Sequence, residues 1–142
     1  MIAKLSVCAA IALFGQVAGN APQPQAQPEA VQLIPIEQAI IDATNAERVR
    51  AGLAPLAVCP ELLKAARAHA AWMTRNQTLQ HTRQAVAENI AMGQRTHVEA
   101  VADWMRSPGH RANILNPSYR RTGAAAYRTD GGTIYWCQQF LW

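Results

Sequence analysis

Apolar residues recur at helical spacing near the start of the folded part of the chain. Ile36, Ile40 and Ala43 fall on one face of a helical repeat, and Gly52 follows as a left-handed cap. This pattern predicts an amphipathic helix over residues 37–51.

A second helix is expected from Pro60 to about residue 76. Proline is tolerated in the first turn of a helix, and Leu62, Ala66 and Met73 then recur along one apolar face. His69 lies on that face, where an imidazole is more often a hydrogen-bonded core residue than a ligand. We therefore interpret His69 as part of the core, with a ligand role as the alternative.

The middle of the chain alternates polar connections with short apolar runs. The polar stretch after the second helix shows no periodicity and is expected to be a loop that presents His81. Glu88 opens an apolar run consistent with a strand, and a capping box at residues 96–99 starts a third predicted helix. The Pro-Gly pair at residues 108–109 ends that helix and places His110 on a sharp connection, with a short helical turn behind it.

The last third of the chain has the pattern of a β-hairpin. The runs 121–127 and 133–140 alternate in character and flank the turn signal Asp-Gly-Gly at residues 130–132. Helices followed by paired strands predict an α+β domain, arranged as a three-layer α-β-α sandwich.

The first residues carry an export pattern. Residues 1–20 are typical of a secretory signal peptide, with Lys4 ahead of an apolar stretch and small residues after it. That stretch is about half the roughly 20 residues needed to cross a membrane, so we expect no transmembrane segment. The Pro/Gln-rich residues 21–35 are expected to be a linker, which leaves residues 36–142 as one domain. We expect a secreted or periplasmic monomer.

The charge balance narrows the choice of partners. The formal net charge is +4, and the arginines that carry it are scattered without a stripe interleaved with aromatic residues. Nucleic-acid binding requires a clustered basic face, so we expect no nucleic-acid partner.

The cysteines suggest a structural cross-link. Cys8 belongs to the signal peptide, which leaves Cys59 and Cys137 in the exported chain. An even number of cysteines in such a chain favours a disulfide between them, and two buried free thiols are the alternative.

Three residues stand out as candidate chemistry. His81, Glu88 and His110 place two imidazoles and a carboxylate on turn-rich connections. Imidazole nitrogen and carboxylate oxygen both ligate zinc, and both groups exchange protons within reach of neutral pH. These residues therefore indicate either a divalent metal site or an acid/base pair.

Two segments carry a family resemblance. They are the run Glu-Asn-Ile-Ala-Met-Gly at residues 88–93 and the run Trp-Met-Arg-Ser-Pro-Gly-His-Arg-Ala-Asn-Ile-Leu at residues 104–115. With them, the chain resembles the bacterial branch of the CAP superfamily, the cysteine-rich secretory, antigen 5 and pathogenesis-related 1 proteins. The resemblance extends from about Glu37 to the C-terminus and implies the same three-layer α-β-α sandwich.

The resemblance also implies a central cleft with two histidines and two glutamates. His81, Glu88 and His110 match three of these positions, while Ser107 stands where the family has its second glutamate. The family likeness implies zinc or another divalent cation on His81 and His110. A neutral hydroxyl donates less charge than a carboxylate, so Ser107 is a poorer ligand. We expect the cleft to be lined by Ser107 together with Trp104, Arg111 and Asn113.

Several functions follow from this arrangement. The first is a secreted binding module that holds a lipid, sterol, peptide or envelope component without chemistry. The second is a zinc-dependent hydrolase with Glu88 as general base beside metal-bound His110 and His81. A serine hydrolase using Ser107, His110 and Glu88 lacks the usual nucleophile motif. A purely structural polar cluster completes the alternatives.

Overall fold

The computed structural model describes residues 32–142. The expected signal peptide and residues 21–31 of the expected linker lie outside the described residues. Within residues 32–142, no helix combines the length and the apolar character needed to span a membrane.

Four helices and four strands make up the described part of the chain. Their order is α1 (Pro35–Arg50), β1 (Ala57–Val58), α2 (Pro60–Asn76), β2 (Ala87–Met92), α3 (His97–Arg106), α4 (Pro108–Ile114), β3 (Arg121–Arg128) and β4 (Ile134–Leu141). The strands form one sheet in the order β1-β3-β4-β2, in which β1 is parallel to β3 and the other pairs are antiparallel.

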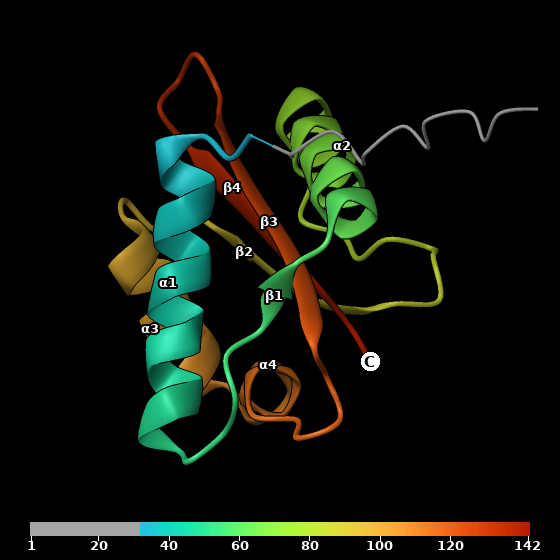
Figure 1. Ribbon diagram of the computed structural model, residues 1–142. Helices are drawn as coiled ribbons and strands as arrows, with labels where there is room; N and C mark the ends of the chain where they lie inside the picture. Colours follow the sequence, from blue (N-terminus) through green and yellow to red (C-terminus); the bar gives the residue numbers. More distant parts are fainter. Residues whose placement is uncertain (1–31) are drawn as a thin grey trace, which may run out of the picture. The chain divides into compact units, whose positions relative to one another are not determined.

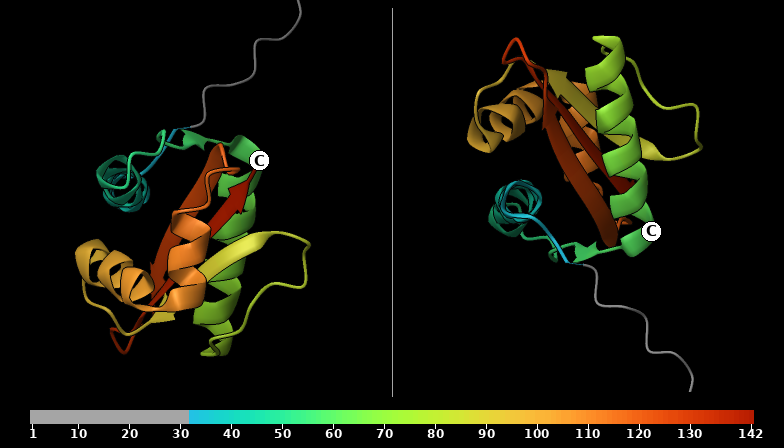
Figure 2. Two further views of the ribbon diagram at one scale, coloured as in Figure 1. Left: turned by 90° about the horizontal axis from the view of Figure 1, so that it is seen from below. Right: turned by 90° about the horizontal axis from the view of Figure 1, so that it is seen from above.

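The sheet lies between two helical layers. Helix α2 covers one face, and α1, α3 and α4 cover the other (Figures 1 and 2). The predicted three-layer α-β-α sandwich is therefore confirmed. The hairpin prediction also holds, because β3 and β4 pair from Arg121 opposite Leu141 to Arg128 opposite Ile134.

One short strand was not predicted, and one local prediction needs correction. The strand β1 has no counterpart among the sequence-based expectations, because a segment of two residues shows no alternation. His110 does not lie on a connection ahead of a helical turn. Helix α4 begins at Pro108, which occupies the first turn as proline favours, so His110 is already helical.

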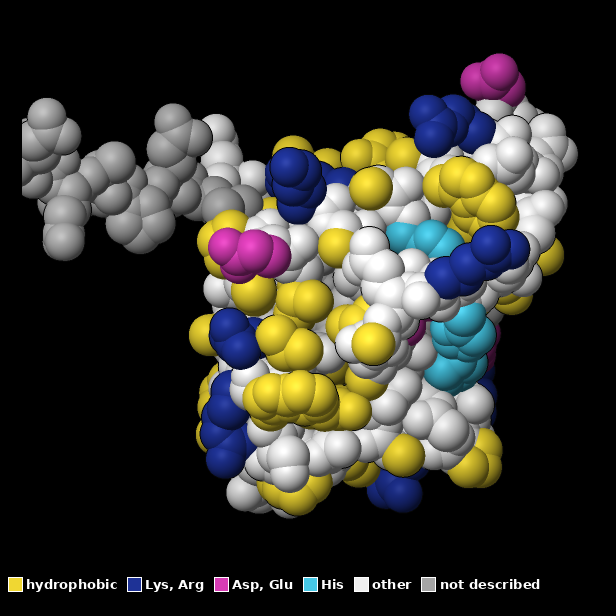
Figure 3. Space-filling model, turned by 90° about the vertical axis from the view of Figure 1, so that its right-hand side faces the viewer, with side chains coloured by type: hydrophobic (Ala, Val, Ile, Leu, Met, Phe, Trp, Pro, Cys, Tyr) yellow, Lys and Arg dark blue, Asp and Glu magenta, His cyan; other side chains and the backbone are white. Residues whose placement is uncertain are grey.

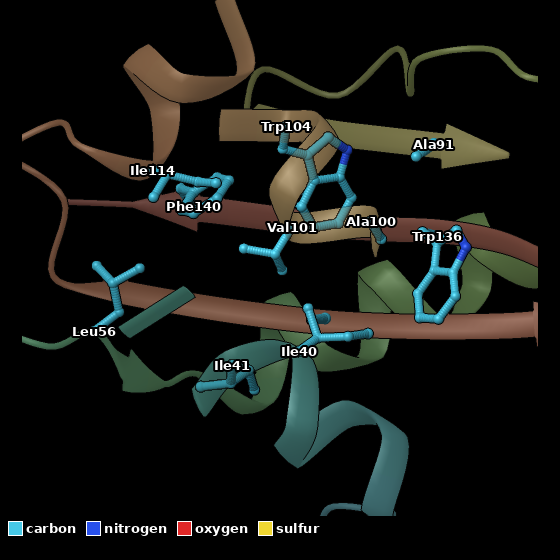
Figure 4. Packing of buried hydrophobic residues seen from close by; sticks show 11 residues of the cluster. Ile40, Ile41, Leu56, Ala91, Ala100, Val101, Trp104, Ile114, Trp136 and Phe140 are labelled. Carbon is cyan, nitrogen blue, oxygen red and sulfur yellow. The ribbon is translucent and has the colours of Figure 1, made fainter. Parts of the chain in front are cut away.

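The hydrophobic core consists of two clusters, one on each face of the sheet. The larger cluster lies between the sheet and helices α1, α3 and α4, where Trp104, Trp136 and Phe140 are each at most 1% exposed (Figure 4). The smaller cluster lies beneath α2 and includes Ala66, Ala70, Met73, Ile90, Ala125, Tyr135 and Cys137. Glu88 and His69, described below, lie on this α2 face of the sheet.

Helix α2 lies unusually close to β3 at one glycine. A Cβ atom on Gly123 would fall 2.2 Å from the backbone nitrogen of Leu63 and 2.3 Å from the carbonyl carbon of Leu62. Only glycine allows the two backbones to approach this closely. The contact fixes the start of α2 on the sheet.

Buried polar residues hold the helices in place. Arg48 is 1% exposed and donates hydrogen bonds to four backbone carbonyls, those of Ala54, Ile114, Asn116 and Tyr119. Burial is the largest cause of the lowered pKa of Arg48. These bonds tie α1 to the segment that leaves α4.

The expected disulfide is absent from the described residues. Cys59 and Cys137 are both buried free thiols. The N–H of Cys59 bonds to the carbonyl of Thr122, whereas Cys137 pairs with Ala125, three positions further along β3. Three strand residues span about 10 Å, which exceeds the roughly 7 Å between Cα atoms that a disulfide can bridge. The prediction erred because cysteine counting carries no information on strand register.

Candidate functional site

The candidate site is built around Glu88 on β2. In the sheet, Glu88 lies opposite Gln139 of β4, and its side chain lies on the face covered by α2, as does that of Ile90 two residues later. The side chain of Glu88 is 2% exposed. The alternation of β2 therefore turns a carboxylate inward, beneath a helix.

Hydrogen bonds compensate for the burial of this carboxylate. Glu88 Oε1 accepts from the backbone N–H of Thr82 and lies 2.9 Å from Nδ1 of His81. Oε2 accepts from Nε2 of Gln139 at 2.9 Å and from the thiol of Cys137 at 3.5 Å. Burial alone would raise the pKa of Glu88, but these donors and a nearby imidazole outweigh it and lower the pKa below its usual value of 4.5.

His81 links this buried carboxylate to solvent. It comes from the loop between α2 and β2, and its side chain is 58% exposed. Because Nδ1 faces the Glu88 carboxylate, it carries the proton in the neutral ring, and Nε2 presents its lone pair outward. The imidazole of His81 is therefore held in one orientation by the buried carboxylate of Glu88.

His69 belongs to the same cluster, which the sequence pattern did not reveal. Its Nε2 lies 2.8 Å from the carbonyl oxygen of Gln80 and 3.7 Å from Oε2 of Glu88. Its ring stacks on Trp72 with centroids 5.9 Å apart and planes 6° apart. The expected hydrogen bond of His69 is present, but the residue borders the site as well as the core. The three-residue helical spacing of His69 and Trp72 was the available signal.

His110 approaches the cluster from the opposite face of β2. A chain of amides holds it, because Nδ2 of Asn89 donates to the carbonyl of His110 and Nδ2 of Asn113 donates to Oδ1 of Asn89. The His110 and His81 ring centroids are 6.3 Å apart. Burial, followed by the proximity of His81, lowers the pKa of His110, which keeps this ring neutral at pH 7.

The expected cleft wall is only partly present. Trp104 is 1% exposed and donates its indole N–H to the carbonyl of Ile90, so it is a core residue and not a wall. Arg111 lines a different hollow, between α3 and α4. Asn113 positions β2 and α4 as described, and Ser107 joins the end of α3 to the start of α4. The helical register of α3, which turns Trp104 toward the sheet, explains the error.

A hollow of about 440 Å³ adjoins the imidazole of His81. It lies between α2 and the following loop and is lined by His69, Trp72, Gln80, His81, Thr82 and Arg83. Figure 3 shows histidine side chains gathered on this side of the molecule, with a basic side chain lying between them and apolar side chains close by. The lining contains no acidic residue.

The donor set limits what metal this site can hold. Among residues 32–142, no three His, Cys, Asp or Glu side chains are arranged to hold a metal ion. The oxygens of Glu88 already accept from several protein donors, and Ser107 replaces the carboxylate expected beside His110. The residues therefore do not fit the three-ligand centre of a zinc hydrolase. They fit at most an ion held by the two imidazoles.

An α-β-α sandwich of this kind, which here carries His81, Glu88 and His110 at the β2 edge of its sheet, is the architecture of an SCP-like domain. The chain belongs to the CAP family, the cysteine-rich secretory protein family, whose model matches residues 41–140.

Named relatives agree with this assignment. The uncharacterised protein YkwD of Bacillus subtilis is 36% identical, over 74% of this chain and 46% of its own length, so this chain spans less than half of that relative. An extracellular SCP-domain protein from Bacillus anthracis is 26% identical with a TM-score of 0.66, over 79% of this chain and 45% of that one. An outer surface protein from Borrelia burgdorferi shares the fold, with a TM-score of 0.66 at 19% identity over 72% of this chain and 89% of its own.

Proposed function

We propose that this CAP domain is a non-catalytic binding module whose ligand occupies the hollow beside His81. The observation that carries the proposal is the state of Glu88, whose side chain is 2% exposed and whose two oxygens accept hydrogen bonds from protein donors. A general base must reach the proton that it removes. Glu88 has no such path, so its role is to hold His81 in one tautomer and one orientation.

The proposed location is outside the cytoplasm. The signal-peptide pattern of residues 1–20 supports it. The similar Bacillus anthracis protein is described as extracellular, which adds to that support. Cell fractionation tests the location, and a protein recovered in the cytoplasm at full length would contradict it.

The chemistry of the hollow favours one of the expected ligand classes. A volume of about 440 Å³ suits a small molecule or one residue of a polymer. Its lining combines imidazoles, a guanidinium and an amide with a single indole. Such a wall suits a polar component of the cell envelope better than a sterol or an acyl chain, because those ligands would leave its polar groups unpaired.

The test is co-sedimentation of the purified chain with isolated cell envelopes, combined with an assay for soluble fragments. We expect the wild type and Glu99→Gln, an exposed control, to sediment with the envelope and to release no fragments. His81→Ala is expected to sediment less. Release of fragments by the wild type, abolished in Glu88→Gln, would contradict the proposal and establish a hydrolase.

A divalent cation on His81 and His110 is the second candidate. The favouring observation is that Glu88 engages Nδ1 of His81, which leaves Nε2 as the other ring nitrogen, and that the His81 and His110 ring centroids are 6.3 Å apart. Neutral imidazoles are good ligands for zinc. When bound, such an ion would add a positive charge that attracts anionic ligand groups. In this arrangement Glu88 orients His81, as carboxylates behind metal-bound histidines do.

A further inference from the structure

Two donors at the hollow beside His81 lack partners among residues 32–142. Within residues 32–142, the buried indoles of Trp104 and Trp136 donate to the carbonyls of Ile90 and Gln94, whereas the indole N–H of Trp72 has no acceptor. The guanidinium of Arg83 likewise makes no hydrogen bond or ion pair with the described residues. Both groups line the same hollow, where a ligand can pair with them.

The charged residues that line the hollow indicate which charge a ligand should carry. Arg83 is the one residue of its lining that is always cationic, and His69 and His81 add imidazoles. The Glu88 carboxylate beneath them is 2% exposed, and its oxygens already accept hydrogen bonds from internal donors. A guanidinium pairs best with a carboxylate or a phosphate, often through two parallel hydrogen bonds. The complementary ligand group is therefore an anion.

The indole of Trp72 indicates which uncharged part of a ligand the hollow can hold. The Trp72 ring is held by its stack on His69, with planes only 6° apart, so its orientation is fixed before a ligand arrives. An indole offers a flat apolar face together with one N–H donor. A pyranose ring matches this combination, because its axial C–H groups form an apolar face and its hydroxyls accept hydrogen bonds. The amide of Gln80 adds a donor and an acceptor at the same wall.

Resting on the proposed binding function, we propose that the hollow takes a pyranose sugar that carries a negative charge. The sugar ring lies against Trp72, and its carboxylate or phosphate pairs with Arg83. The inference makes Trp72 and Arg83, which lie outside the His-Glu-His cluster, the residues that determine specificity.

The experiment is an NMR titration of the isotope-labelled chain that follows the indole N–H signal of Trp72. N-acetylmuramic acid and N-acetylglucosamine form one probe pair, which differs by a lactyl carboxylate. Glucose 6-phosphate and glucose form the second pair, so the two pairs separate a carboxylate from a phosphate as the anion. We expect at least one anionic sugar to bind about tenfold more tightly than its neutral partner.

Two variants assign the contacts. Arg83→Gln is expected to remove the preference for the anionic sugar. Trp72→Ala, followed through the backbone amide signals of the residues that line the hollow, is expected to bind both members of the pair more weakly. Arg75→Gln changes an exposed arginine of α2 outside this hollow and is expected to bind like the wild type. Since Arg83 is exposed, its substitution leaves the fold intact, and dispersed amide signals verify this for Trp72→Ala.

Defined outcomes overturn the inference. Equal affinity for charged and neutral sugars, no binding of any probe up to about 10 mM, or an unchanged preference in Arg83→Gln would each reject it. If the sugars fail while the chain still sediments with envelopes, only this inference falls. If sedimentation fails as well, the proposed function falls with it.

Discussion

Glu88 Oε1 lies 2.9 Å from Nδ1 of His81, although the first side chain is 2% exposed and the second is 58% exposed. The pair thus connects the interior beneath α2 to the surface hollow. The carboxylate fixes the tautomer of the imidazole, and the imidazole covers the carboxylate. Whatever the exposed Nε2 contacts is therefore aligned by a residue that solvent does not reach.

The first prediction concerns the pH dependence of stability. The pKa of Glu88 is lowered in the folded state, so its ionised form stabilises the fold above the ordinary pKa of 4.5, and this contribution is lost as the pH falls through the folded-state value. Glu88→Gln replaces one of the two acceptor oxygens with an NH2 group, which then opposes either the Thr82 or the Gln139 donor. We expect it to lower the free energy of unfolding by about 1–3 kcal/mol at neutral pH.

Urea unfolding between about pH 7 and pH 3 measures this effect. The difference between wild type and Glu88→Gln is expected to be full at neutral pH and to shrink below about pH 4.5. Glu47→Gln, which removes a surface ion pair with Arg50, is expected to change stability by less than about 0.5 kcal/mol at any pH. A difference that grew in acid would show that the sign assigned to Glu88 is wrong.

The second prediction concerns Cys137, which is fully buried beside Glu88. Burial, and then the Glu88 charge, raise the pKa of the Cys137 thiol well above its usual range. Because the thiolate is the reactive form, we expect iodoacetamide to label Cys137 at least about 100-fold more slowly in the folded chain than in denaturant. Peptide mapping by mass spectrometry measures both rates. A peptide joined to Cys59 under non-reducing conditions would contradict the free-thiol arrangement.

The third prediction concerns the contact between α2 and β3. Gly123→Ala would place a Cβ 2.2 Å from the backbone nitrogen of Leu63, and neither backbone can move away without breaking its own hydrogen bonds. We expect a loss of about 3 kcal/mol or more, measured by thermal unfolding. Gly109→Ala is the matched control, because no atom lies within 4 Å of its Cβ position and alanine favours the helix by up to about 1 kcal/mol. Equal melting temperatures for the two variants would refute the close approach.

Much of the fold follows from periodicity in the sequence. The apolar face of α2 and the turn between β3 and β4 are local patterns, and the observed bounds Pro60–Asn76 and the pairing of Arg128 with Ile134 agree with them. Strand β1 could not be predicted, because a strand of two residues is too short to show an alternation of apolar and polar side chains. The disulfide prediction is wrong because the distance between Cys59 and Cys137 depends on strand register, which short-range patterns do not specify.

Only the site residues whose side chains suit metal binding or proton transfer could be predicted from the sequence. His81 stands in a polar loop, Glu88 opens a short apolar run and His110 follows a Pro-Gly pair, and the structure brings the three together. Gln139 is 51 positions from Glu88 in the chain, so only the β2–β4 register places its amide against that carboxylate. The apolar face of the second helix predicts a core position for His69. The same pattern does not predict that the loop containing Gln80 will pack against this side chain and bring it into the site.

The last prediction concerns metal binding by the two imidazoles. With two imidazole ligands and no third side-chain ligand beside them among the described residues, we expect zinc to bind with a Kd in the range of about 10 μM to 1 mM, far weaker than at a three-ligand site. Calorimetric titration near neutral pH measures it, and His81→Ala/His110→Ala is expected to abolish the heat. His97→Ala removes a histidine outside the cluster, at the first position of α3, and is expected to leave binding unchanged. Nanomolar affinity would require a third ligand, while wild-type affinity in the double variant would place the ion elsewhere. The first result would reject the two-ligand site, and the second would leave His81 as a hydrogen-bonding group that Glu88 orients toward the ligand.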